Sequence, residues 1–307
     1  MKRFLTRTLT LIVLPLASLF GVCEYLLRQV DNDYRYKATW MDRNSETVEV
    51  YCLGSSHTYF GFEPSCLSLR AFNAAHVAQG LKYDVFLLNK YIGRMPSLRY
   101  VILPMSYFSL TNYDLEQDTE NWRVKKYTLY YDCPYHRFTP KYVFESYAFD
   151  PVRTIKAALG REDERYCNEL GRGSHYLLEQ RAADWKASGP EAALRHRRER
   201  DSQDLIDYNI KYVEEIRRLC HSHGVTLVLI TLPAYATYRD NLDARQLSVV
   251  TGYCAASDSS HDDVIYLNWL NHPSFGDADF FDADHLNQYG AERLSHMLDS
   301  VLTSSVR

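Results

Sequence analysis

Two nearly continuous apolar runs constrain the fold of this chain more than any other feature. Residues 100–105 read YVILPM, and residues 225–232 read VTLVLITL. A strand carries apolar residues at consecutive positions when both of its faces are covered, as in a parallel sheet with helices on either side. The two runs therefore predict strands buried inside an α/β domain.

Three further segments have strand patterns, and helical patterns lie between them. Shorter strands are predicted at residues 48–53, 70–75 and 264–269, and apolar residues recur at helical spacing in residues 79–92, 190–221, 242–254 and 287–301. Helices that alternate with buried strands indicate a doubly wound, flavodoxin-like, five-stranded parallel sheet with helices on both faces. Reactive groups in such sheets gather at the carboxyl ends of the strands.

Residues 1–31 differ from the rest of the chain. Basic residues precede an apolar run from Thr8 to Cys23, which continues past a single Glu24. About 20 residues of helix cross the apolar core of a bilayer, and the basic flank predicts a cytoplasmic N-terminus. Large side chains at Phe20 and Val22 leave no convincing site for signal cleavage. We expect a retained single-pass anchor with the main domain outside the cytoplasm.

The remaining chain is interpreted as a linker and one domain. Residues 32–46 are polar and are predicted to be the linker, and residues 47–307 form the α/β domain. Within it, residues from about 107 to 190 are rich in Tyr and Phe and carry few strand signals, although 152–159 and 174–186 have helical patterns. We expect an insertion that lies over the carboxyl ends of the strands as a lid.

Composition excludes several functional classes. The 307 residues are 46% apolar and 24% charged, with a net charge of −4, so no overall field favours nucleic acid. The basic run at residues 195–200 is interleaved with acidic residues and is typical of a solvated helix face. Seven cysteines are scattered without the paired spacing of zinc sites, so no structural metal is expected.

Two short segments place reactive side chains at predicted strand ends. Residues 54–57, reading GSSH, follow the first strand, and glycine there permits a sharp turn that exposes a hydroxyl at the edge of the sheet. Residues 282–285, reading DADH, open the last predicted helix, so Asp282 and His285 would share one face of a helical turn. A serine hydroxyl reacts only when a base removes its proton. The two segments together predict a serine nucleophile with a histidine base.

These segments resemble the SGNH (GDSL) hydrolase family. Gly54-Ser55-Ser56 stands where that family has Gly-Asp-Ser, and residues 282–285 match its C-terminal D-x-x-H. The resemblance implies that Ser56 is the nucleophile, His285 the general base and Asp282 the residue that orients it. The layout is most similar to membrane-anchored members that modify cell-surface glycans, including the alginate O-acetylation proteins and the D-alanine-transfer protein of teichoic acids.

The sequence also departs from the family pattern. Ser55 replaces the acidic residue before the nucleophile, which leaves Ser55 as an alternative nucleophile, and Asp284 is an alternative orienting residue. For the oxyanion donors, Gly80 corresponds to the glycine after the second strand, with Gln79 or Ala78 as alternatives. No Asn follows the third strand directly, so either this donor is missing or Ser106 or Tyr107 replaces it.

The expected function is that of an extracytoplasmic serine esterase or O-acyltransferase. Its substrates would be small, acetyl-type esters of an envelope or secreted glycan, with no cofactor or metal, and its partners the membrane and a membrane acyl-donor protein. The runner-up is a weakly catalytic or non-catalytic member that binds glycan or a partner in a polysaccharide acylation assembly, which the missing Asn favours. A third reading is a cytoplasmic lipase-like enzyme whose N-terminal helix packs against the domain.

Overall fold

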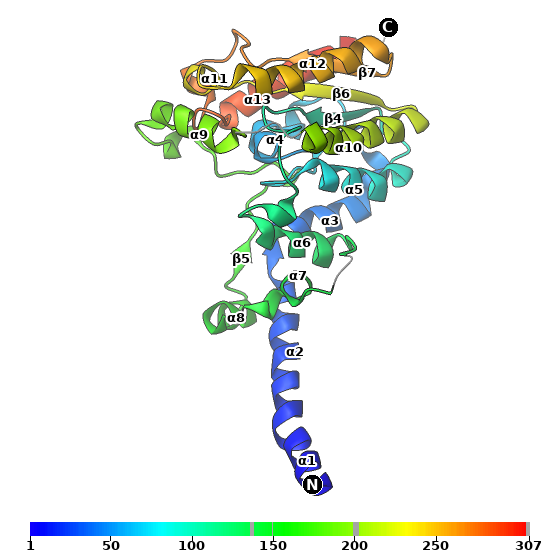
Figure 1. Cartoon of the computed structure of the whole chain (residues 1–307), viewed down its shortest axis with the longest axis vertical. Helices are drawn as coiled ribbons and strands as arrows, with labels where there is room; N and C mark the ends of the chain where they lie inside the picture. Colours follow the sequence, from blue (N-terminus) through cyan, green and yellow to red (C-terminus); the bar gives the residue numbers. More distant parts are fainter. Residues whose placement is uncertain (136–137, 149, 199–202, 305–307) are drawn as a thin grey trace. The chain divides into compact units, whose positions relative to one another are not determined.

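The computed structural model describes residues 1–135, 138–148, 150–198 and 203–304. The chain divides into two compact units (Figure 1). Unit 1 combines Met1–Thr39 with Thr119–Arg165, and unit 2 combines Trp40–Asp118 with Tyr166–Arg307. The segment expected to be one insertion is therefore divided: residues 119–165 belong with the N-terminal helix, and residues 166–190 belong with the sheet.

Unit 2 is built on a five-stranded parallel sheet. Its strand order is β3-β2-β4-β6-β7, with bounds β2 Val50–Cys52, β3 Ala71–Asn73, β4 Tyr100–Pro104, β6 Thr226–Thr231 and β7 Val264–Asn268. Each predicted strand is present, and the order is that of a doubly wound, flavodoxin-like sheet. The predicted fold class is confirmed. The order reverses between β2 and β4, where such sheets place their ligands.

Helices cover both faces of this sheet (Figure 1). In unit 2 they are α4 Ser56–Gly61, α5 Leu81–Tyr91, α9 Ser188–His196, α10 Gln203–Ser222, α11 Ala236–Arg239, α12 Ala244–Ser260 and α13 Gln288–Ser304. Helices α5 and α10 pack against each other, as do α4 and α13. Alternate strand residues and one face of α13 form a buried core of Val50, Cys52, Ile102, Val228, Ile230, Leu294, Leu298 and Leu302.

Unit 1 contains the N-terminal helix and a small sheet. A continuous helical segment runs through α1 Lys2–Thr8, a π-helical turn Leu9–Val13 and α2 Leu14–Gln29. Shorter helices are α6 Val124–Tyr130, α7 Pro140–Val143 and α8 Pro151–Ala158, and β1 Asp31–Asn32 pairs in parallel with β5 Asp163–Glu164. Thr6–Gln29 is long enough to cross a membrane, and an 18-residue window within it has a mean hydropathy of 1.9.

Local structure differs from the sequence patterns at several places. Residues 32–46, predicted to be a polar linker, are mostly helical, because helix α3, Asp33–Asn44, occupies most of them. Its buried residues Tyr34, Lys37, Ala38 and Met41 have helical spacing, and the lysine within this set hid the pattern. Residues 174–186 contain only short 3-10 turns, and the helix predicted at 190–221 is the separate helices α9 and α10.

Candidate active site

The turn after β2 depends on Gly54. Its φ of +111° lies in the region that favours glycine, and a Cβ there would lie 2.1 Å from Pro104 Cγ. The Gly54 N–H donates to Asp84 Oδ1 at 2.8 Å, and Gln79 Nε2 donates to the same oxygen at 2.6 Å. This contact fixes the turn, so that Ser55 precedes α4 and Ser56 is its first residue.

Ser56, His285 and Asp282 form a hydrogen-bonded chain. Ser56 Oγ lies 2.9 Å from His285 Nε2, and His285 Nδ1 lies 3.0 Å from Asp282 Oδ1 and 3.1 Å from Oδ2. With Nδ1 protonated, the ring donates to the carboxylate and accepts from the hydroxyl. The arrangement can therefore deprotonate Ser56 when its Oγ attacks an electrophilic carbon.

The segment that carries Asp282 and His285 differs from the expected helical turn. Residues 282–285 form a bend, and α13 begins only at Gln288. The Asp282 carboxylate holds this bend, because its Oδ1 accepts from the N–H groups of Asp284 at 3.0 Å and His285 at 2.8 Å. A local carboxylate-to-backbone turn thus brings Asp282 to the ring in place of helical spacing.

A second carboxylate lies on the inner side of His285. The Asp284 side chain is 1% exposed, and its oxygens lie 3.5 Å from His285 Nδ1 and 3.5 Å from His57 Nε2. His57 Nδ1 lies 2.9 Å from Ser106 Oγ. His196 Nδ1, 3.9 Å from Asp284, is hydrogen-bonded to the Tyr238 hydroxyl at 2.9 Å. The sequence patterns assigned no role to His57 or to His196.

These contacts set the charge of the site. Burial alone lowers the pKa of His285, but the carboxylates of Asp284 and Asp282 outweigh it and hold that pKa well above its ordinary range. Burial likewise raises the pKa of Asp284, and His285 and His57 outweigh it and hold the value well below its ordinary range. Burial lowers the pKa of His196 to about 3. Of the histidines around Asp284, His285 is therefore the one whose protonated form the carboxylates favour.

His285 and two residues beside it could also offer atoms to a metal. His57, Asp284 and His285 each place one potential ligand atom within 4.8 Å of the others. Both ring nitrogens of His285 already have partners, Ser56 and Asp282, at hydrogen-bond distance. A metal on this ring would displace one of them, so hydrogen bonding accounts for the cluster better than ligation.

An aromatic stack covers the outer side of His285. Tyr176 stacks on Phe60 at 3.6 Å and on Phe281 at 4.1 Å between ring centroids, and its ring edge faces His285 at 5.3 Å. The loop that carries Tyr176 passes close to α4, where a Cβ at Gly173 would lie 2.2 Å from the Tyr59 ring. Part of the predicted insertion thus lies over the base, although no sequence signal identified Tyr176.

The remaining predicted site residues are distributed over two small cavities. Gln79 and Gly80 line a cavity of about 30 Å³ together with Ser55. Ser106 and Tyr107 line one of about 10 Å³ beside His57 and Asp284. The Tyr107 hydroxyl accepts from the Asp243 N–H at 3.2 Å, and the Tyr107 side chain is buried.

A larger cavity of about 420 Å³ reaches Asp282. Its lining combines aromatic rings with polar and acidic groups, from Gln180, Ala182, Asp184, Trp185, Ala187, Ser188, Glu191, Phe281 and Asp282. Most of these residues belong to the 166–190 part of the predicted insertion. The cavity is large enough for a small organic ligand.

Comparisons with known proteins give structural similarity only. No protein-family model and no curated protein sequence matches the chain. A GDSL-like lipase from Bacteroides thetaiotaomicron superposes with a TM-score of 0.43 at 10% identity, covering 90% of this chain and all of that one. A candidate acylhydrolase from Bacteroides fragilis superposes with a TM-score of 0.44 at 10% identity, covering 87% and 96%. Similarity at this level assigns no activity.

The Asp84 contact predicts an unusual dependence of stability on pH. Burial raises the pKa of Asp84 to about 7, although the donors Gln79 and Gly54 lower it. Between about pH 4 and pH 7 the folded state holds a proton that the unfolded state has lost, so this carboxyl makes the free energy of unfolding fall as pH rises. Asp84→Asn keeps the Oδ1 acceptor and should flatten this slope in denaturant titrations from pH 4 to 8. Asp204→Asn, at an exposed position of α10, should leave the slope unchanged, and an unchanged slope in Asp84→Asn would contradict the assignment.

The Asp284 contact predicts the titration of His285. Asp284→Asn removes a buried negative charge and should lower the pKa of His285, because the imidazolium loses a stabilising partner. The measurement is NMR of histidine-labelled protein over a pH series. Asp277→Asn removes an exposed carboxylate and is the control. Equal His285 titrations in wild type and Asp284→Asn would show that Asp284 does not set the charge of the base.

Proposed function

We propose that this protein is an SGNH-type serine esterase or O-acyltransferase. The observation that carries the proposal is the chain of contacts from Ser56 through His285 to Asp282, at 2.9 and 3.0 Å. These contacts occur after β2 and before α13, at the strand order reversal where doubly wound sheets bind ligands. Ser56, and not Ser55, contacts the base, so Ser56 is the proposed nucleophile.

The reaction follows from these positions. His285 Nε2 takes the hydroxyl proton as Ser56 Oγ attacks the ester carbonyl, and Asp282 stabilises the imidazolium that forms. His285 then gives this proton to the departing alcohol oxygen, which leaves an acyl group on Ser56. Water or a second hydroxyl, deprotonated by His285, attacks this acyl group and regenerates Ser56. The first outcome is hydrolysis and the second is acyl transfer.

Oxyanion stabilisation is assigned to groups near the turn. Ser56 opens α4, so its own N–H has no acceptor within the helix and can donate to the tetrahedral oxygen. Gly80, which lines the cavity beside Ser55, is the proposed additional donor, whereas Gln79 donates its side-chain amide to Asp84 and its backbone N–H to the His76 carbonyl. Ser106 hydrogen-bonds with His57, and Tyr107 is buried with its hydroxyl accepting from Asp243. We therefore assign Ser106 a positioning role and Tyr107 a structural one.

The substrate proposed is a small acyl ester of an envelope or secreted glycan. An acetyl-type acyl group is proposed because the cavities near the turn are small, at about 30 Å³ beside Ser55 and about 10 Å³ beside His57. The larger cavity at Asp282 offers aromatic and hydrogen-bonding groups of the kinds that sugars contact. A membrane acyl-donor protein is the partner proposed for the transfer reaction.

Active-site labelling tests the enzyme proposal. A fluorophosphonate should modify wild-type protein at Ser56, and Ser56→Ala and His285→Ala should abolish the modification. Asp282→Asn should slow it by on the order of 10² to 10⁴-fold, because the ring loses its orienting acceptor. Labelling of wild type should speed up as pH rises, since His285 must be neutral to act as a base.

The matched control is Ser55→Ala, which should label normally. Loss of labelling in Ser55→Ala with retention in Ser56→Ala would move the nucleophile to Ser55. A wild-type protein that neither labels nor cleaves simple acetyl esters would favour the alternative of a glycan-binding member of an acylation assembly. This alternative is supported by the sequence, because no Asn follows β4 directly to serve as an oxyanion donor.

We also propose that the N-terminal helix anchors the protein with its N-terminus in the cytoplasm and unit 2 outside. The apolar stretch Thr6–Gln29 and the basic residues before it support this topology. A reporter that is active only outside the cytoplasm, fused after Arg307, should be active, and intact mass should show the N-terminus retained. A reporter active only in the cytoplasm, or a new N-terminus near residue 24, would contradict the anchor.

A further inference from the structure

One face of α8 exposes large apolar side chains. Val152, Ile155 and the adjoining Leu159 are 62%, 59% and 59% exposed. Their spacing of three and four residues places them on one side of the helix; we call these three residues the α8 stripe. Tyr147 and Phe138, also in unit 1, are 57% and 77% exposed. Exposed apolar side chains gathered on one helix face indicate a surface that something covers.

The α8 helix packs beside the C-terminal part of α2 (Figure 1). The opposite face of α8 is held by ion pairs: Arg153 contacts Glu164 at 2.6 Å and the buried Glu145 at 3.6 Å. Glu145 also binds Lys126 at 2.7 Å, and the positive charges lower the pKa of Glu145 to about 2 despite burial, which raises it. The inward face is therefore anchored by charge, and the stripe points away from the unit.

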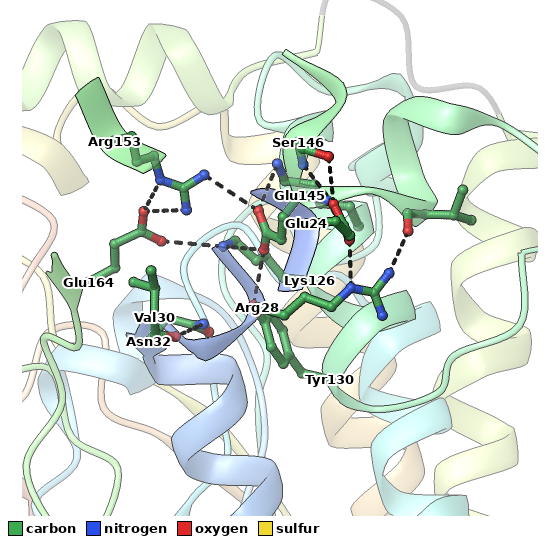
Figure 2. Close-up of polar contacts among 12 residues, drawn as sticks. Glu24, Arg28, Val30, Asn32, Lys126, Tyr130, Glu145, Ser146, Arg153 and Glu164 are labelled. Atoms are coloured by element: carbon green, nitrogen blue, oxygen red, sulfur yellow. Dashed lines mark hydrogen bonds and ion pairs between the residues drawn. The ribbon is translucent and has the colours of Figure 1, made fainter. Parts of the chain in front are cut away.

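The same cluster fixes α8 at a defined height along α2 (Figure 2). The Glu24 carboxylate, on α2, accepts from Ser146 N at 2.9 Å, from Ser146 Oγ at 2.8 Å and from Glu145 N at 3.2 Å. One turn later, Arg28 donates to the Val143 carbonyl at 3.0 Å. Residues 143–146 are thus attached to the last turns of α2, a few residues before α8 begins.

The level along α2 at which residues 143–146 are attached corresponds to the edge of the apolar core of a bilayer. The helix between the charged residues Arg7 and Glu24 is about 26 Å long at 1.5 Å per residue, close to the roughly 30 Å of a bilayer core. Phe20, one turn before Glu24, contacts the Phe144 ring at 5.2 Å, which in turn contacts Phe138 at 6.4 Å. The apolar surface of α2 thus continues directly into exposed residues of unit 1.

We propose that the α8 stripe inserts into the outer headgroup region of the bilayer that α2 spans. An interfacial helix has an apolar side directed at the acyl chains and charged residues beside it. Lys156 flanks the stripe and Arg161 follows it, both exposed, which suits the phosphate layer. The part of unit 1 beside α2 would then lie on the membrane surface. This inference rests on the proposed anchorage of α2.

Quenching of an added tryptophan tests the contact. The full chain carrying Ile155→Trp is reconstituted into phosphatidylcholine vesicles with brominated acyl chains, and the emission beyond that of the wild type, with its four tryptophans, is measured. We expect the added emission to be quenched by brominated lipid and protected from aqueous iodide. Leu194→Trp, at a 69% exposed position of α9 in unit 2, should show the reverse. Val152→Trp and Leu159→Trp give independent repeats.

The outcomes separate this inference from the anchor itself. Carbonate extraction that releases the wild-type chain from the vesicles would overturn both. A chain that resists extraction while Ile155→Trp is quenched by iodide and not by lipid would overturn only the α8 contact. Protection from both quenchers would also overturn it, because the stripe would then be covered by protein and not by lipid.

Discussion

The hydrogen bond from the Gly54 amide to the buried Asp84 carboxyl holds the element on which the proposed chemistry depends. This bond, 2.8 Å long, fixes the backbone between the end of β2 and the start of α4. Pro104, in the neighbouring strand β4, fills the space that a side chain at position 54 would need. The backbone that leads from β2 to Ser56 therefore has one defined path. A serine held this way pays little conformational entropy when it meets a base.

The second constraint is electrostatic. His285 lies between Asp282, which is partly exposed, and Asp284, which is buried beside two further histidines. The outer carboxylate orients the ring, whereas the inner one adds charge in a region where water cannot screen it. A base with a raised pKa is a strong proton acceptor but is protonated more of the time. Asp284 therefore has two opposite effects on His285. It makes the neutral ring a stronger base, and it lowers the fraction of molecules in which the ring is neutral.

The sequence was sufficient for the sheet, and it singled out Ser56, His285 and Asp282, which lie within hydrogen-bond distance of one another, but it did not reveal their surroundings. Continuous apolar runs identified β4 and β6 because burial on both faces places apolar residues at consecutive positions, which the sequence shows directly. Asp84 was missed although it lies on the same helix face as Leu81, Val85 and Leu88, where a carboxyl is out of place. Tyr176 and His196 reach the site through long-range packing, which spacing along the chain does not encode. The split of residues 107–190 between two units is likewise a property of tertiary contacts.

Glu24 has a consequence for the biosynthesis of the protein. The backbone groups that its carboxylate accepts from, at Glu145 and Ser146, follow it by 121 and 122 positions. At about 5–20 residues per second, the ribosome adds this length in roughly 6–24 seconds. In the proposed anchorage, the helix that carries Glu24 would enter the membrane long before its partners are synthesised. Insertion of this helix and closure of unit 1 would then be successive events, separated by synthesis of the first three strands of the main sheet.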